Sequence, residues 1–396
     1  MNTEALRTVA ATYGTPTYIF DVREVEARIR LLRSLLPEDT GLCFAVKANP
    51  FLIPYVADLV DRLEVCSPGE YEICIQEQIA PEKLVVSGVN KTYESMKRIL
   101  SYSKGAGIYT IESEEHAKIL RTLAEKNQMP LSVLIRLSSG NQFGVDAKTF
   151  FRLAKEIQES PYLTLAGVHY YAGTQKRQSK LEKELDTLTA FAKTFEEETG
   201  TVLNELEYGA GMKVSYFIND SEKDQRESEP EPQIQALAEK LRTCAYGKKT
   251  IELGRFLVSM SGYYLTRVMD VKRTAQPGFL ILDGGIHQIN YYGWMMGMKQ
   301  PEIEVLAEKD GDEELFHLCG SLCTVNDVLA RDVALHDPQK GDVICFKRCG
   351  AYAATEGMAM FLSRELPQVL ICKTDGKIEK LRDQMETYLF HVSATT

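Results

Sequence analysis

The chain has 396 residues, and its 44% hydrophobic and 26% charged residues are an ordinary globular composition, long enough for one large domain and a smaller one. The net charge of −10 argues against nucleic acid and anionic membranes as general partners. The start MNTEALRTVAATYG lacks the apolar core of a signal peptide, and no apolar run approaches the ~20 residues of a spanning helix. Nine cysteines without CxxC pairs and six dispersed histidines predict a reduced, cytoplasmic protein without a disulfide framework or a metal site.

Short β-rich runs alternate with helix-like segments between Gly41 and Arg255. The predicted strands are 42–48, 62–66, 83–88, 107–111, 131–137, 163–170, 203–208 and 249–253. Helix-like segments include 113–127, 147–160 and 180–200. Such alternation predicts a parallel sheet, and eight strands are the number that closes a (β/α)8 barrel.

The sequence changes character in two later segments. Residues 219–233, NDSEKDQRESEPEPQ, are charged and contain prolines, so we expect a solvated excursion of the barrel there. After Arg255, short β runs such as GFLILDGG, DVICFKRC and QVLICKT are separated by Gly, Pro and Asp turns. The predicted fold class is therefore an α/β (β/α)8 TIM-like barrel followed by a mostly antiparallel β domain.

Polar residues and glycines gather at the carboxyl ends of the predicted strands, where the active sites of such barrels lie. They are Lys47, Ser67, Gly88, Glu112, Arg136, His169, the glycines of 209–211, Glu252 and Arg255. We therefore expect one site at the barrel mouth.

Lys47 is the most informative of these residues, because it ends an apolar run. Desolvation by Phe44 and Val46 would lower the pKa of its amine and leave it neutral, able to form a Schiff base. Alternatively, Lys47 forms an ion pair with a carboxylate at the mouth. Its position alone leaves both interpretations open.

Three loops at the same mouth suit a phosphate. EYGAGM (207–212) brings backbone N–H groups close to an anion, HYYAGTQ (169–175) adds Gly173 and Thr174, and ELGR (252–255) supplies Arg255. With a nearby amine, they indicate pyridoxal 5′-phosphate (PLP). Glu252 would then keep the pyridine nitrogen protonated, with an attraction of about 4 kcal/mol at 4 Å and a dielectric of 20. Pairing of Glu252 with Arg255 remains the alternative.

Six motifs occur in a fixed order along nearly the whole chain: FAVKAN, GVHYYAGTQ, YGAGM, ELGR, CGSLCTVND and GDVICFKRCGAYA. The set resembles the fold-type III PLP-dependent decarboxylases, which include diaminopimelate, ornithine and arginine decarboxylases. The resemblance implies a barrel over 24–258, a β domain built from 1–23 and 259–396, and a homodimer whose active sites are shared between subunits.

The resemblance also implies roles for individual residues. Lys47 would hold PLP, Glu252 would bind the pyridinium, and Cys323 of the partner subunit would reprotonate the carbanion. The remaining cofactor contacts would be His169, Tyr171, Thr174, Gly209, Ala210, Gly211, Gly254, Arg255 and Tyr352. Expected substrate contacts are Arg136, Thr324 and Asp327.

The departures from the family pattern concern the substrate. Thr324 follows Cys323 where the family has Glu or Asp, which weakens the case for a free distal amine, although Asp327 keeps the last acidic position of the motif. GSLCT, HYYAGTQ and MFLSRELP resemble a branch of secondary metabolism, some members of which act on carrier-linked or conjugated amino acids. The expected function is decarboxylation of an α-amino acid or its conjugate.

Three alternatives remain: diaminopimelate decarboxylase proper, a PLP-dependent racemase, and a non-catalytic relative. Racemases of this fold set an arginine against the pyridine nitrogen, so Glu252 favours decarboxylation. Retention of Lys47, Glu252 and Cys323 together argues against a non-catalytic protein.

Overall fold

A computed structural model describes residues 1–273, 276–291 and 296–393. The chain forms two compact units. The barrel unit consists of Arg28–Val214 and Arg226–Leu257, and the β unit of Met1–Ala27, Ser215–Gln225 and Val258–Thr396. Within the described residues, no helix is long and apolar enough to cross a membrane.

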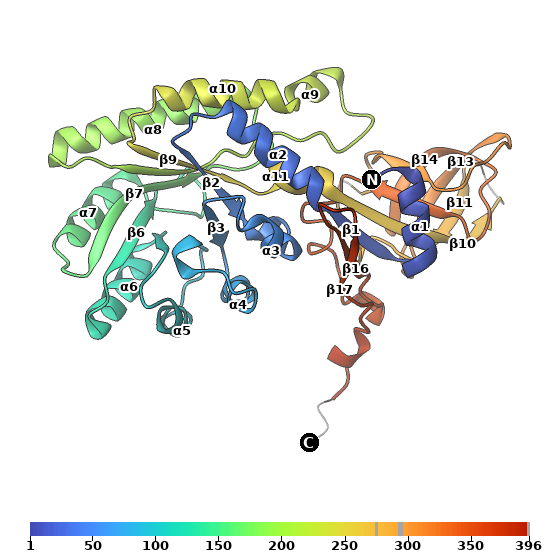
Figure 1. Cartoon of the computed structure of the whole chain (residues 1–396), viewed down its shortest axis with the longest axis horizontal. Coiled ribbons are helices and arrows are strands. Elements are labelled where there is room, and N and C mark those ends of the chain that lie inside the picture. The colour runs from blue at the N-terminus through green and yellow to red at the C-terminus, as the bar shows by residue number, and fades with distance from the viewer. Residues whose placement is uncertain (274–275, 292–295, 394–396) are drawn as a thin grey trace. The chain divides into compact units, whose positions relative to one another are not determined.

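The barrel unit contains a closed barrel of eight strands (Figure 1). They are β2 (Thr40–Ala45), β3 (Arg62–Val65), β4 (Leu84–Val86), β5 (Ile108–Ile111), β6 (Leu131–Arg136), β7 (Leu163–Tyr171), β8 (Glu205–Gly209) and β9 (Lys248–Leu253). Neighbouring strands are parallel, and pairing of β2 with β9 closes the ring. All eight predicted strands are confirmed, and with them the predicted barrel.

Helices alternate with the strands, and those of the barrel unit cover its outside (Figure 1). They are α3 (Ile53–Val56), α4 (Pro68–Gln76), α5 (Tyr93–Ser103), α6 (Glu114–Asn127), α7 (Ala147–Gln158), α8 (Gln178–Thr199) and α10 (Pro230–Arg242). Helices α2 (Val22–Leu35), α9 (Glu222–Glu227) and α11 (Arg255–Val258) each contain residues of both units. Ser67, Ser113 and Asp146 cap α4, α6 and α7, because each side chain accepts a backbone N–H of the first turn. The three predicted helices are confirmed within two residues at each end.

The prediction that residues 219–233 are solvated is confirmed, since none of them is buried, but they form α9 and the start of α10, and residues 219–225 belong to the β unit and not to the barrel. Pro230 occupies the first turn of α10, where its missing N–H costs nothing. Ile234 and Leu237 are fully buried, and Lys213 Nζ lies 3.0 Å from a carboxylate oxygen of Glu227. The apolar stripe of α10 therefore decides its structure, although the segment before it is dominated by charge and proline.

The apolar core of the barrel unit lies between the strands and their helices. Phe150 of α7 and Phe195 of α8 are fully buried and meet edge to face, with ring centroids 5.8 Å apart. Inside the barrel, Cys43, Val85, Ile108 and Leu134 form a second, smaller apolar cluster, and Cys43 and Val85 lie opposite Arg62 and Glu64 of the neighbouring strand.

The β unit contains a mixed sheet (Figure 1). Its strand order is β14-β13-β11-β10-β1-β16-β17, and β15 pairs with β10 and β12. Helix α1 (Thr3–Tyr13) precedes β1 (Thr17–Asp21). The later strands are β10 (Gly262–Lys272), β11 (Gly278–Leu282), β12 (Ile303–Val305), β13 (Glu313–Cys319), β14 (Val328–His336), β15 (Val343–Lys347), β16 (Gln368–Cys372) and β17 (Ile378–Arg382). Only the pairs β1–β16 and β11–β13 are parallel among these strands, which confirms the mostly antiparallel prediction.

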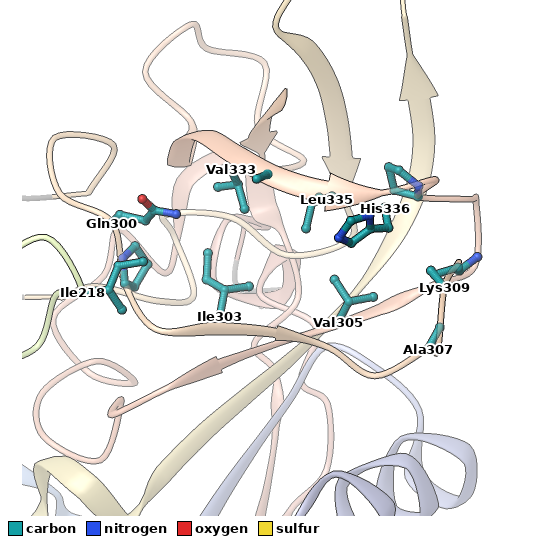
Figure 2. A pocket seen from close by; sticks show the side chains of 12 residues that line it. Ile218, Gln300, Ile303, Val305, Ala307, Lys309, Val333, Leu335 and His336 are labelled. Atoms are coloured by element: carbon teal, nitrogen blue, oxygen red, sulfur yellow. The ribbon is translucent and has the colours of Figure 1, made fainter. Parts of the chain in front are cut away.

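A cavity of about 430 Å³ lies in the β unit between β12 and β14 (Figure 2). Ile303 and Val305 of β12 face Val333 and Leu335 of β14 across it. Among its described lining residues, only Lys309 and His336 are titratable, and no residue predicted for the site is among them. This cavity is therefore lined mostly by apolar side chains and is separate from the predicted site residues.

Candidate active site

The interior of the barrel carries buried charges that contact one another across it. Arg62 of β3 forms ion pairs with Glu205 and Glu207 of β8, the latter at 2.8 Å, although β3 and β8 are not neighbours in the ring. Side chains two residues apart on a strand point to the same face, so Glu64 follows Arg62 into the interior. These contacts define a polar column that ends at the barrel mouth.

Lys47 lies at the mouth, but not on a strand as its apolar context suggested. Strand β2 ends at Ala45, and Lys47 sits in a short 3-10 turn, Val46–Ala48. Its Nζ forms an ion pair with Glu64 and lies 3.6 Å from Oε1 of Glu252. Lys47 therefore forms the expected contacts with carboxylates of the mouth, which hold its amine in position, and its Schiff base with a cofactor stays a prediction.

Glu64 is the residue of this cluster that the sequence reasoning missed, together with its partners Cys66 and Ser87. The Ser87 hydroxyl donates to Oε1 of Glu64, and Cys66 Sγ donates to the same oxygen at 3.0 Å. Burial would raise the pKa of Glu64, but the charge of Lys47 and these hydrogen bonds outweigh it and lower the pKa to about 2. In the run RLEVC, Arg62 and Glu64 alternate with apolar residues, and this pattern is the signal that could have identified Glu64.

Cys66 lies beside the lysine but is not an activated thiol. Its Sγ is 3.5 Å from Lys47 Nζ, and burial, with the charge of Glu64, raises its pKa well above the ordinary value of a thiol. A thiol in this state is a hydrogen-bond donor and not a nucleophile. Its contacts indicate a role in holding Glu64.

Glu252 joins two predicted site residues. Its Oε2 lies 3.0 Å from Nε2 of His169, and its other oxygen faces Lys47. The strand register places Tyr171 of β7 opposite Gly209 of β8, and Gly209 opposite Glu252 of β9. The structure therefore brings these residues into one row at the mouth.

The glycines of the loop after β8 are required by close contacts. A Cβ on Gly211, whose φ is +59°, would approach the Gly173 carbonyl oxygen at 2.2 Å. A Cβ on Gly209 would lie 2.4 Å from the Tyr171 ring. Similarly, a Cβ on Gly254 would meet Ala48 Cβ at 2.9 Å, so the chain after β9 passes close to the Lys47 turn. Backbone approaches a ligand closely only where such side chains are absent.

These residues fit PLP. The Lys47 amine suits the aldehyde of the cofactor, and a carboxylate beside it suits the ring nitrogen. The neighbouring glycine loop suits the phosphate. Ala210 lies in that loop, Thr174 follows Gly173 in the neighbouring one, and Arg255 begins α11. The remaining predicted residue of this unit is Arg136. It is buried, and its guanidinium lies 2.9 Å from a carboxylate oxygen of Glu112. Its guanidinium carbon lies 4.7 Å from the ring centroid of Phe143.

The predicted residues of the β unit lie in two loops. Cys323 is exposed, and Thr324 is half-buried. Asp327 is buried and accepts the backbone N–H groups of Ile286 at 2.9 Å and Leu322 at 2.7 Å. This geometry gives Asp327 a loop-closing role, next to Cys323, that the sequence did not predict. Tyr352 has a positive φ of +63° in the second loop.

Glu207 should make stability depend on pH. Burial raises its pKa from 4.5 to about 7, with Arg62 and His169 opposing the shift and Glu252 adding to it. A raised carboxyl pKa stabilises the fold below pH 4.5, and this contribution is lost as pH rises through about 7. We expect the wild type to lose about 3 kcal/mol of unfolding free energy between pH 4.5 and 8 relative to Glu207→Gln. Urea unfolding at both pH values measures this, and identical pH dependence of the two proteins would contradict it.

Comparison with known proteins identifies the family. Residues 22–259 match the pyridoxal-dependent decarboxylase family, in its pyridoxal binding domain. Diaminopimelate decarboxylase of Pseudomonas aeruginosa is 30% identical over 380 residues, which cover 88% of this chain and 85% of that protein. The L-glutamyl-[BtrI acyl-carrier protein] decarboxylase of Niallia circulans is 26% identical, covering 96% of this chain and 94% of that protein. A crystal structure of diaminopimelate decarboxylase from M. jannaschii in complex with L-lysine has a TM-score of 0.85 at 21% identity, covering 96% and 92% of the two chains.

The chain therefore belongs to the pyridoxal-dependent decarboxylase family. This confirms the predicted fold, the predicted cofactor PLP and the predicted class of reaction.

Proposed function

We propose that this protein decarboxylates an α-amino acid, or an amino acid conjugated to another acid or to a carrier protein, to the corresponding amine. The observation that carries the proposal is the Lys47 amine held between Glu64 and Glu252, beside the glycine loop. When bound, PLP supplies an electron sink for the electrons that departing carbon dioxide leaves behind.

The residues of the barrel mouth have distinct tasks in this proposal. Lys47 would hold the cofactor through its aldehyde and would take the place of the amine product on it. Glu252 stabilises a proton on the ring nitrogen, and His169 orients that carboxylate through their 3.0 Å contact. Tyr171 supports the ring. The phosphate is held by Thr174, Gly209, Ala210, Gly211, Gly254, Arg255 and Tyr352.

Cys323 is the proposed proton donor to the α carbon, acting from the second subunit of a homodimer. A positioned general acid of this kind contributes about 10²–10⁴ in rate. Its exposure and the closing of its loop by Asp327 support this role. The β unit also exposes several large apolar side chains, which suits a surface covered by a second copy. They are Met358, Phe361, Leu362, Leu389, Phe390 and Val392.

The substrate is proposed to lack a free distal amine, or to carry it in conjugated form. Thr324 stands where the family has an acidic residue, and a relative that matches 96% of this chain acts on a glutamyl group attached to a carrier protein. Diaminopimelate itself is the second candidate, because the relative at 30% identity is a diaminopimelate decarboxylase. Arg136 is proposed to contact the substrate.

Two further proposals concern the whole chain. We place the domain boundaries at 24–258 for the barrel and at 1–23 plus 259–396 for the β domain. A cytoplasmic location is supported by the nine cysteines, all of which are free in the structure.

Product mass spectrometry tests the proposed function. PLP-loaded protein is offered diaminopimelate, lysine, ornithine, arginine, glutamate, and conjugated or carrier-linked amino acids. We expect an amine lighter than its substrate by one carbon dioxide. Because Cys323→Ala removes the proton donor, we expect it to lower formation of the normal amine by about 10²–10⁴-fold.

Cys319→Ala is the matched control, since Cys319 is a half-buried cysteine of β13. We expect this variant to keep turnover within threefold of the wild type. Racemised product would overturn decarboxylation, and turnover of free diaminopimelate would overturn the argument from Thr324. Unchanged turnover in Cys323→Ala would remove that residue from the mechanism.

A further inference from the structure

Lys176 is a buried lysine beside the glycine loop that none of the roles above uses. It lies between β7 and α8, and its side chain is only 1% exposed. Its Nζ donates to the carbonyl oxygen of Gly209 at 2.9 Å and to Oε2 of Glu184 at 2.7 Å. A cation is rarely buried so completely unless it is paired and bonded in this way.

The same residue also holds a second carbonyl of the loop. The backbone N–H of Lys176 donates to the carbonyl oxygen of Gly211 at 2.9 Å. In a trans peptide the C=O and the following N–H point in opposite directions. With the Gly209 and Gly211 carbonyls directed at Lys176, the N–H groups of Ala210 and Met212 are directed to the other side of the loop. A pair of backbone N–H groups presented in this way suits an anion.

The stem of Lys176 packs tightly under the loop. A Cβ added to Gly211 would lie 3.0 Å from Lys176 Cε, so the glycine backbone rests on the lysine side chain. Lys176 Nζ lies 5.0 Å from the ring centroid of Tyr208 and 5.6 Å from that of Tyr171, within range of cation–π attraction. Packing and rings together leave the amine little freedom to move away from Gly209.

Glu184 of α8 neutralises the lysine and is itself fixed. It is buried, and its Oε2 also accepts the Tyr208 hydroxyl at 2.8 Å. Burial lowers the pKa of Lys176, while the charge of Glu184 and their hydrogen bond oppose that shift. Lys176, Glu184 and Tyr208 are therefore linked by hydrogen bonds beneath the loop, and the lysine amine is directed at the Gly209 carbonyl.

We propose that Lys176 is a positioning residue for the cofactor phosphate: it holds the Gly209 and Gly211 carbonyls back, so that the N–H groups of Ala210 and Met212 face the phosphate, while Glu184 and Tyr208 hold its amine. This inference rests on the proposed function, which places the phosphate at this loop. It predicts that Lys176 acts on the phosphate and not on the ring.

The test compares PLP with pyridoxal, which lacks the phosphate. Full-length holoenzyme is equilibrated by dialysis against decreasing PLP, and the same exchange is measured with pyridoxal. We expect Lys176→Met to weaken PLP binding by about 10–100-fold, as loss of hydrogen bonds around a charged group does. Pyridoxal binding is expected to change less than threefold. The ³¹P resonance of bound PLP is expected to shift toward that of the free cofactor.

Lys91→Met is the matched control. Lys91 is another buried lysine of the barrel unit, and its Nζ donates to the Gly88 carbonyl at 2.8 Å and to Thr110 at 3.2 Å. The variant is expected to leave the PLP-to-pyridoxal affinity ratio within threefold of the wild type. Tyr208→Phe is a milder second variant, since it removes only the hydroxyl bond to Glu184, and is expected to weaken PLP binding about two- to fivefold.

The outcomes separate this inference from the proposed function. Wild-type protein that binds no PLP would overturn the proposed function and the inference with it. Wild-type protein that binds PLP, with Lys176→Met and Tyr208→Phe binding it equally well, would overturn the inference alone. Equal losses for PLP and pyridoxal would also overturn it, because they would mean general damage to the site.

Discussion

Replacing Glu252 with glutamine is expected to lower kcat for decarboxylation by about 10²–10³-fold, while the protein stays folded and binds PLP. Glutamine keeps the size of the side chain but removes the charge that holds a proton on the ring nitrogen. At about 4 Å and an effective dielectric of about 20, that attraction is worth about 4 kcal/mol. The cofactor ring in the Glu252→Gln protein is therefore a weaker electron sink. Carbon dioxide release under saturating substrate measures the loss, and cofactor absorption shows whether PLP is still bound.

Glu205→Gln is the control for this substitution. Glu205 is equally buried in the barrel, but it pairs with Arg62 and with Lys248, the latter at 3.4 Å. We expect its kcat to stay within threefold of the wild type. A Glu252→Gln enzyme within fivefold of wild type would rule out a role for Glu252 at the ring nitrogen.

The barrel was predictable because its strands are short, apolar and separated by helices of 3.6-residue period. Positions at strand ends were less certain: the run 42–48 became β2 over Thr40–Ala45, since Lys47 turns out of the sheet to meet Glu64. In the β unit, β13 and β14 were not predicted, because runs such as EELFHLC mix acidic residues into the strand. Pairing with a neighbour overrides such weak local preferences.

The site was only partly predictable for a different reason. Lys47, His169, Gly209 and Glu252 stand at strand ends, so chain order alone placed them at one mouth. Contacts that cross the barrel depend on its closure and register. The pairing of Arg62 with Glu205, 143 residues later, is of this kind, and so is the bond between Ser87 and Glu64. The Lys176–Glu184 pair was missed because a lysine beside a loop and a glutamate on a helix are usually solvated.

Replacing Gly167 with alanine is expected to destabilise the protein by about 3 kcal/mol, at the upper end of what overpacking costs. Gly167 lies in β7, and an added Cβ would stand 1.9 Å from the backbone oxygen of Glu205 in β8 and 2.6 Å from its carbonyl carbon. Backbone atoms cannot rotate away as a side chain can. Both strands are also paired on their other edges, β7 with β6 and β8 with β9, so neither can move alone. Urea unfolding of the variant and the wild type measures the difference.

Gly69→Ala makes the same chemical change where there is room for it. Gly69 lies in the first turn of α4, its Cβ would meet only Ser67 Oγ at 3.7 Å, and alanine in a helix is favoured over glycine. We expect Gly69→Ala to raise the unfolding free energy by about 0.5–1 kcal/mol, the opposite sign from Gly167→Ala. A loss of less than 1 kcal/mol in Gly167→Ala would show that β7 and β8 can separate at little cost. His169 and Tyr171 follow Gly167 on β7, so strands that moved so easily could not hold these residues in register with Glu207 and Gly209.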